Sequence, residues 1–237
     1  MSKVVFQDVT KTYFKESMEK GKTDRITAVD GFSLEIRDHE FITLTGPSEC
    51  GKTTVLRLVM GLEEPDSGEI LTDSKWITHR KTETRNTGMV FQSGSLYPHM
   101  TVYKNLAFPL KKQKLQREEA DARIRETAAL LKITEILSEK PGKLTKEENQ
   151  RAAIARAIVS MPDVVVMDEP LRGLDEQERG RLRAELIRLR ERRLFTVIYA
   201  AYDLAEAMAL GDRAVQMEEG RILSVNTPEE LLRSMRS

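Results

Sequence analysis

The nine residues at positions 46–54, Gly-Pro-Ser-Glu-Cys-Gly-Lys-Thr-Thr, constrain the fold of this chain most strongly. They follow an apolar stretch at 41–45 that is typical of a strand. After them, apolar residues recur at helical spacing, at Val55, Leu58, Val59 and Leu62. The local order is therefore strand, glycine-rich loop and amphipathic helix.

In that setting, the spacing Gly-x-x-x-x-Gly-Lys-Thr indicates a phosphate site. Backbone N–H groups surround the α- and β-phosphates of a nucleotide, Lys52 reaches the β- and γ-oxygens, and Thr53 offers a hydroxyl to Mg²⁺. The helix adds the positive end of its dipole. The alternative is a simple glycine turn. The predicted phosphate-binding residues are Gly46, Ser48, Glu49, Cys50, Gly51, Lys52, Thr53 and Thr54.

The rest of the chain alternates strand and helix patterns, which predicts an α/β fold with a mostly parallel sheet. Segment 101–137 departs from this alternation. There, an apolar stripe at Ala120, Ile124, Ala128 and Leu131 indicates helix. We therefore expect one domain over residues 1–237, with a helical subdomain inserted at about 93–160.

A second candidate chemical group follows the apolar run at 164–167, which suits a strand buried on both faces. Asp168 and Glu169 stand at its end. Beside a phosphate loop, an aspartate at a strand tip can hold Mg²⁺, and the adjacent carboxylate can orient or deprotonate an attacking water. A solvated acidic loop is the other interpretation.

Composition limits the classes that remain. The chain has 38 basic and 38 acidic residues, so no overall positive field favours nucleic-acid binding. Cys50 is the only cysteine, which excludes an internal disulfide. No apolar run approaches the length of a membrane-spanning helix, and the first residues contain no signal-peptide pattern. We expect a soluble chain that reaches a membrane only through a partner.

Several motifs occur together in the order found in the ATPase subunits of ABC transporters, and the chain resembles that family over essentially its whole length. After the phosphate loop come Gln92, the stretch Leu-Tyr-Pro-His-Met-Thr-Val at 96–102, Gln-Arg-Ala-Ala-Ile-Ala-Arg-Ala at 150–157, the acidic pair at 168–169 and Leu-Asp at 174–175. The stretch at 96–102 and Thr-Pro-Glu-Glu-Leu at 227–231 look most like sugar-importer ATPases. Because the sequence ends soon after the latter, we expect their extra C-terminal domain to be absent.

The resemblance implies the ABC ATPase fold, with an antiparallel β subdomain, and a head-to-tail dimer that binds ATP and Mg²⁺. It implies that Tyr13 stacks on adenine, although an aromatic at a core edge is an alternative. Glu169 and Lys52 would be catalytic, as would Gln92, which would also join Thr53 and Asp168 at the metal.

The implied partners are integral membrane permease subunits, a second ATPase subunit and an extracytoplasmic solute-binding protein. The implied location is the cytoplasmic face of the cell membrane.

Three departures from the family pattern fall where the γ-phosphate would bind. The family signature Leu-Ser-Gly-Gly-Gln is replaced by Leu-Thr-Lys-Glu-Glu at 144–148, although Thr145 can still cap a helix and Glu147 and Glu148 suit a helix N-terminus. Tyr202 stands where the family has histidine, and tyrosine is not a cation near neutral pH. Glu49 replaces a glycine, which strains the loop if that position needs positive φ.

Three hypotheses follow. The first is an energising ATPase subunit of an importer for sugars or other small solutes. The second is a degenerate subunit that binds ATP, hydrolyses it weakly and supports a related partner in a mixed pair. The third, a soluble ABC ATPase of repair or translation, has less support, since the sequence contains neither a duplicated cassette nor a basic arm. Because a homodimer would carry each defect twice, we favour a heteromeric assembly.

Overall fold

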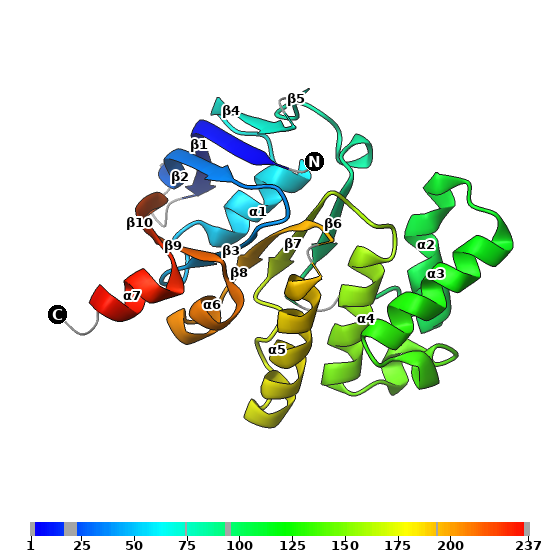
Figure 1. The fold of residues 1–237 in the computed structure, drawn as a ribbon. Coiled ribbons are helices and arrows are strands. Elements are labelled where there is room, and N and C mark those ends of the chain that lie inside the picture. The colour runs from blue at the N-terminus through cyan, green and yellow to red at the C-terminus, as the bar shows by residue number, and fades with distance from the viewer. Residues whose placement is uncertain (1–2, 17–22, 74, 93–95, 193, 235–237) are drawn as a thin grey trace. The chain divides into compact units, whose positions relative to one another are not determined.

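The computed structural model describes residues 3–16, 23–73, 75–92, 96–192 and 194–234 (Figure 1). They divide into two compact units. The first comprises the segments up to residue 86 and from residue 196 onward, and the second comprises residues 87–195. Within the described ranges, no helix combines the length and apolar character that crossing a membrane requires.

The first unit contains an antiparallel sheet with strand order β2-β1-β4-β5. Phe6 and Phe32 pack edge to face in its core, with ring centroids 5.1 Å apart. The antiparallel β subdomain that the resemblance implies is thus confirmed, and the pairing of β1 with β2 continues through several register shifts. Its strands are β1 (Val4–Glu16), β2 (Thr23–Ile36), β4 (Ser67–Thr72) and β5 (Lys75–Trp76).

The same unit contains four further strands in the order β10-β9-β3-β8. Strand β3 pairs in parallel with both neighbours, and β10 closes the edge as the antiparallel half of a hairpin. Every residue of β3 and β8 is buried, as expected for strands covered on both faces. The strands are β3 (Phe41–Thr45), β8 (Thr196–Ala200), β9 (Arg213–Glu218) and β10 (Arg221–Asn226).

The helices of the first unit pack on these strands (Figure 1). Helix α1 contacts β2 and β8, and α6 contacts β3 and β9. Their bounds are α1 (Lys52–Met60), α6 (Leu204–Leu210) and α7 (Pro228–Ser234), with a short 3₁₀ turn at Thr82–Thr84. Helix α1 ends at Met60 because Gly61 adopts a left-handed conformation, so the predicted apolar stripe was wrong at Leu62, which is 47% exposed.

The described residues of the second unit form two parallel strands and four α-helices. Helix α4 contacts α2, α3 and α5 as well as β6. The elements are β6 (Thr87–Val90), α2 (Val102–Leu110), α3 (Arg117–Leu130), α4 (Lys146–Ile158), β7 (Val164–Asp168) and α5 (Glu176–Glu191), with 3₁₀ turns at 111–113, 134–136 and 141–143.

The predicted change to helix in this region is confirmed, but the boundaries differ. Ile124, Ala128 and Leu131 of the predicted stripe are buried. Helix α4 starts at Lys146 because Thr145 caps it. Strand β6 ends at Val90, so Gln92 stands in a turn. The predicted subdomain over 93–160 remains a prediction, and its residues 93–95 lie outside the described ranges.

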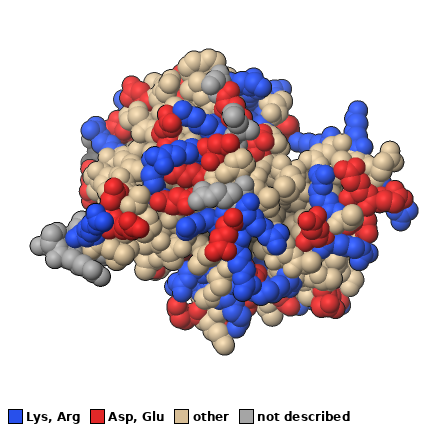
Figure 2. Space-filling model, in the orientation of Figure 1, with Lys and Arg blue, Asp and Glu red and all other residues tan. Residues whose placement is uncertain are grey.

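Lys and Arg side chains are interspersed with Asp and Glu over the face drawn in Figure 2, as the equal numbers of acids and bases lead one to expect.

Candidate functional site

The loop between β3 and α1 has a backbone that requires glycine at two positions. Gly46 has φ 148°, and a Cβ atom there would lie 2.1 Å from the carbonyl oxygen of Met217. Gly51 has φ 103°, and a Cβ atom there would lie 2.2 Å from the carbonyl oxygen of Ala28. Both approaches are closer than any side chain allows, so the loop conformation depends on these two glycines.

Lys52 lies back over this loop. It is buried, and its Nζ donates to the carbonyl oxygens of Gly46, at 2.8 Å, and Pro47, at 3.2 Å. Helix α1 begins at this lysine, and its N-cap residue, Gly51, offers no side chain to the first backbone N–H groups. The loop thus combines an ammonium group, a helix N-terminus and close backbone approach, which is the donor set that a phosphate chain needs.

The remaining predicted phosphate-binding residues follow the same loop. Ser48 is exposed, Cys50 is buried, and Thr53 and Thr54 are half-buried on the first turn of α1. Glu49 is exposed and has φ 66°. This position therefore needs positive φ, and a glutamate occupies a left-handed conformation in which glycine would be unstrained.

Tyr13 lies in β1, opposite Ile26 of β2. The Nζ atom of Lys11 stands 5.6 Å from the centroid of its ring. Its hydroxyl is buried and has no hydrogen-bond partner among the residues that the structure describes. The stacking of Tyr13 on adenine stays a prediction.

The second unit brings two of the other predicted residues together. Strands β6 and β7 pair in parallel with Val90 opposite Met167, so their carboxyl ends are level. Gln92 and Glu169 follow these ends, and Arg172 contacts both. Its Nη1 donates to Glu169 Oε2 at 2.8 Å, and its Nη1 and Nε lie 3.2 Å from the Gln92 amide oxygen when that amide is turned toward it.

Glu169 has φ 43°, a second left-handed non-glycine residue at a predicted functional position. Its side chain is largely buried, whereas that of Arg172 is half-exposed. Asp168 is the last residue of β7 and is half-buried. Thus Gln92, Asp168 and Glu169 belong to the second unit, and Tyr13 and residues 46–54 to the first.

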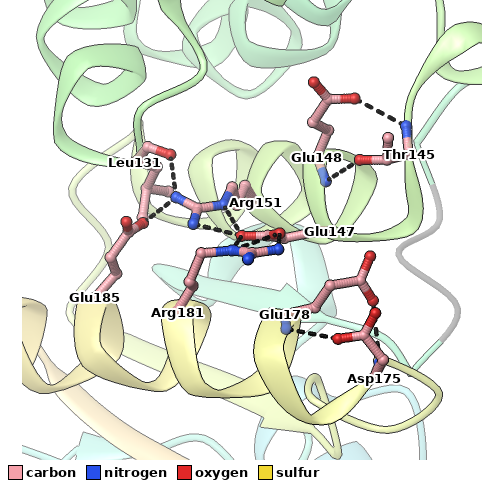
Figure 3. Close-up of polar contacts among 9 residues, drawn as sticks. All are labelled: Leu131, Thr145, Glu147, Glu148, Arg151, Asp175, Glu178, Arg181 and Glu185. Atoms are coloured by element: carbon pink, nitrogen blue, oxygen red, sulfur yellow. Dashed lines mark hydrogen bonds and ion pairs between the residues drawn. The ribbon is translucent and has the colours of Figure 1, made fainter.

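The altered signature segment forms the N-terminus of α4 (Figure 3). The Thr145 hydroxyl accepts from the Glu148 N–H, and a Glu148 carboxylate oxygen accepts from the Thr145 N–H, at 2.8 Å. This is a complete capping box. The expectation that Thr145 caps the helix is confirmed, and Glu148 has a structural partner of its own.

Glu147 faces the other way, toward α5, and its carboxylate lies between two arginines (Figure 3). It accepts from Arg151 Nη2 at 2.6 Å and from Arg181 Nη2 at 2.6 Å. The hydrogen bond from Arg181 lowers the pKa of Glu147, and that from Arg151 acts in the same direction against the opposing effect of burial. Arg151 also pairs with buried Glu185, so the Glu147 carboxylate is one member of a charged network between two helices.

Tyr202 stands just after β8, at the position where the resemblance places a histidine. Its side chain is 53% exposed, and its backbone N–H donates to Glu206 Oε1 at 3.4 Å.

Sequence reasoning missed Arg172 and Arg181. Arg172 had a local signal, because a basic residue three positions after a carboxylate within a turn is within reach of it. Arg181 had none, since it is 34 positions from Glu147 and only the packing of α5 on α4 brings the two together.

The chain is similar to known proteins in sequence and in fold. Residues 29–172 match the family model described as ABC transporter. The chain is 48% identical over 212 residues to the trehalose/maltose import ATP-binding protein MalK of Thermococcus litoralis, covering 87% of this chain and 57% of that protein. It is 42% identical over 231 residues to the trehalose import ATP-binding protein SugC of Mycobacterium tuberculosis, covering 98% and 56%. The chain thus spans just over half the length of these relatives.

Solved structures share the fold. The ATP-binding cassette MJ0796, in a dimeric post-hydrolysis state bound to ADP and phosphate, matches with a TM-score of 0.82 and 27% identity, covering 95% of this chain and 98% of that one. The protein cbiO1 from Clostridium perfringens, part of the ABC transporter complex cbiONQ, matches with a TM-score of 0.83 and 25% identity, covering 98% of this chain and 91% of that one.

Proposed function

Because the chain belongs to the ABC transporter family, we propose that it is an ATP-binding subunit that couples ATP binding and hydrolysis to the movement of a membrane permease. The observation that carries the proposal is the loop at 46–54. Gly46 and Gly51 approach neighbouring backbone too closely for any side chain, and the Lys52 ammonium group lies over the loop. The loop leads into helix α1, whose N-terminus has no N-cap side chain. This donor set fits the phosphates of ATP.

The residue roles follow the motifs. Lys52 binds the β- and γ-phosphate oxygens, and Tyr13 stacks on the base. Thr53, Gln92 and Asp168 supply the hard oxygen ligands that Mg²⁺ prefers, and Mg²⁺ would neutralise charge developing on the phosphates. Glu169 accepts the proton of the water whose oxygen bonds to the γ-phosphorus, while the bond to ADP breaks and its electron pair leaves with ADP.

The relatives suggest the cargo and the partners. Two of them are named as import proteins for trehalose or maltose, so we infer a sugar importer. In such an assembly, the chain binds integral membrane permease subunits at the cytoplasmic face and pairs with a second ATPase subunit. An extracytoplasmic solute-binding protein delivers the sugar.

A second candidate function is favoured by the N-terminus of α4. There the capping box uses the Thr145 and Glu148 backbone N–H groups, and Glu147 is bound to two arginines. Glu49 adds a strained residue to the phosphate loop. These features support a degenerate subunit that binds ATP, hydrolyses it slowly and relies on a better-equipped partner.

Two measurements test the proposal. Calorimetric titration of MgATP into the purified chain should give saturable binding that Lys52→Ala weakens at least tenfold. The matched control, Lys75→Ala, alters an exposed lysine of the same unit and should bind as the unaltered chain does. Steady-state hydrolysis is then measured for the chain alone and after co-expression with a second ATPase subunit and a permease, with Glu169→Gln as the inactive variant.

The outcomes separate the two functions. Hydrolysis by the chain alone that Glu169→Gln abolishes identifies an ordinary motor subunit. Binding without hydrolysis until a second ATPase subunit joins identifies the degenerate partner. If the chain binds MgATP neither alone nor after co-expression with its partners, both functions are refuted.

A further inference from the structure

Arg172 contacts both Gln92 and Glu169, the two predicted catalytic residues of the second unit. Its Nη1 donates to the Glu169 carboxylate at 2.8 Å, and with the Gln92 amide turned so that its oxygen faces Arg172, Nη1 and Nε lie 3.2 Å from that oxygen. The level ends of β6 and β7 bring these groups together. A planar guanidinium can hold two acceptors in a fixed relation, which lysine cannot do.

The contacts occupy the atoms that the reaction uses. Where a guanidinium N–H donates to a carboxylate oxygen, the O–H of an attacking water has to compete with that N–H for the same oxygen. An amide oxygen that accepts from the same guanidinium is likewise withheld from a metal ion or water.

We propose that Arg172 is a positioning residue that holds Glu169 and Gln92 in a resting arrangement and slows hydrolysis until it releases them. The inference rests on the proposed function of Glu169 and Gln92.

The exposure of Arg172 makes release easy. Its side chain is 49% exposed, whereas that of Glu169 is 14% exposed. An ion pair with one half-exposed partner is weak and is screened by salt. The restraint should therefore slow turnover by about two- to fivefold, the range that a surface pair of this kind supports.

Steady-state kinetics of Arg172→Ala test the inference. We expect kcat to rise about two- to fivefold with KM for ATP unchanged, because Arg172 contacts the residues that act on water and not the phosphate loop's lysine. Raising the ionic strength should speed the unaltered chain toward the rate of Arg172→Ala. Arg172→Lys, which keeps the charge without the fork, should give an intermediate kcat. Arg125→Ala, which removes an exposed ion pair from α3, is the matched control and should leave kcat unchanged.

A double-mutant cycle of Arg172→Ala and Glu169→Gln in urea unfolding gives a readout that does not need activity. Measurable coupling supports the contact, and its absence overturns the inference. A kcat of Arg172→Ala equal to or below that of the unaltered chain also overturns it. If MgATP binds but hydrolysis does not depend on Glu169, the proposed function of Glu169 fails instead. If no assembly containing the chain hydrolyses ATP, the proposed motor function and this inference fail together.

Discussion

At the scale of single residues, Glu49 places a strained backbone and a negative charge in the phosphate loop. Its φ of 66° costs a non-glycine residue roughly 1–2 kcal/mol. Glu49→Gly should therefore raise the free energy of unfolding by about 0.5–1 kcal/mol, after the entropy that glycine loses on folding. It should also tighten MgATP binding. Urea unfolding and calorimetric titration measure the two effects.

The matched control is Glu49→Gln, which removes the charge and keeps the strain. It should tighten MgATP binding without the gain in stability. A Glu49→Gly variant less stable than the unaltered chain would show that the loop is not strained at this residue.

Glu147 gives a pH-dependent prediction. Its pKa is lowered by Arg181 and Arg151, so its contribution to stability is fully present above its ordinary pKa of 4.5 and is lost as the pH falls through the lower value of the folded state. Glu147→Gln should cost about 1–3 kcal/mol at pH 7, because it removes charged hydrogen bonds. The difference from the unaltered chain should narrow below pH 4.5, which unfolding measured across a pH series can establish.

Glu148→Gln is the matched control at pH 7, since glutamine can complete the same capping box and should cost little. A difference at Glu147 that stays constant into the acid range would contradict the ion-pair assignment.

At the scale of elements, the buried Arg85 fixes the end of the phosphate-loop helix. Its Nη1 donates to the carbonyl oxygens of Leu58 and Val59, each at 2.7 Å, at the C-terminal end of α1, and burial lowers its pKa. Arg85→Met should lower the free energy of unfolding by about 2–4 kcal/mol, because several carbonyl groups lose their donor.

Arg57→Met is the matched control for α1, since Arg57 is exposed on the same helix and should change stability by less than about 0.5 kcal/mol. Both variants can be measured by urea unfolding. Equal stabilities would mean that Arg85 does not anchor the helix.

Elements were predictable from the sequence where local chemistry determines them. The burial of β7 follows from its continuous apolar run at 164–167, and the phosphate loop follows from the spacing of two glycines and a lysine. The start of α4 is marked in the sequence by the capping signal of Thr145 and Glu148, although its charged first turn hides the apolar periodicity. Arg85 and Arg181 could not be assigned, because their partners come from distant segments.

At the scale of the whole molecule, the residues to which we assign the proposed turnover come from both units. Lys52 belongs to the first, and Glu169 and the altered signature belong to the second. In the proposed dimer, the signature segment faces the partner's ATP. There the Glu147 carboxylate repels a phosphate, and Arg151 and Arg181 reduce this electrostatic repulsion by screening the carboxylate.

The triple variant Lys146→Gly, Glu147→Gly and Glu148→Gln restores the family signature apart from Thr145, and two opposed effects should follow. It removes Glu147 from its arginines and frees the first turn of α4, so stability should fall by about 2–4 kcal/mol. It also removes two carboxylates from the segment that meets the partner's nucleotide, so kcat should rise at least about tenfold, equivalent to 1.4 kcal/mol of barrier. The same triple variant with Glu169→Gln should stay inactive. A less stable chain with unchanged turnover would mean that the signature segment does not limit hydrolysis, and Tyr202 and Arg172 would then account for any slow rate.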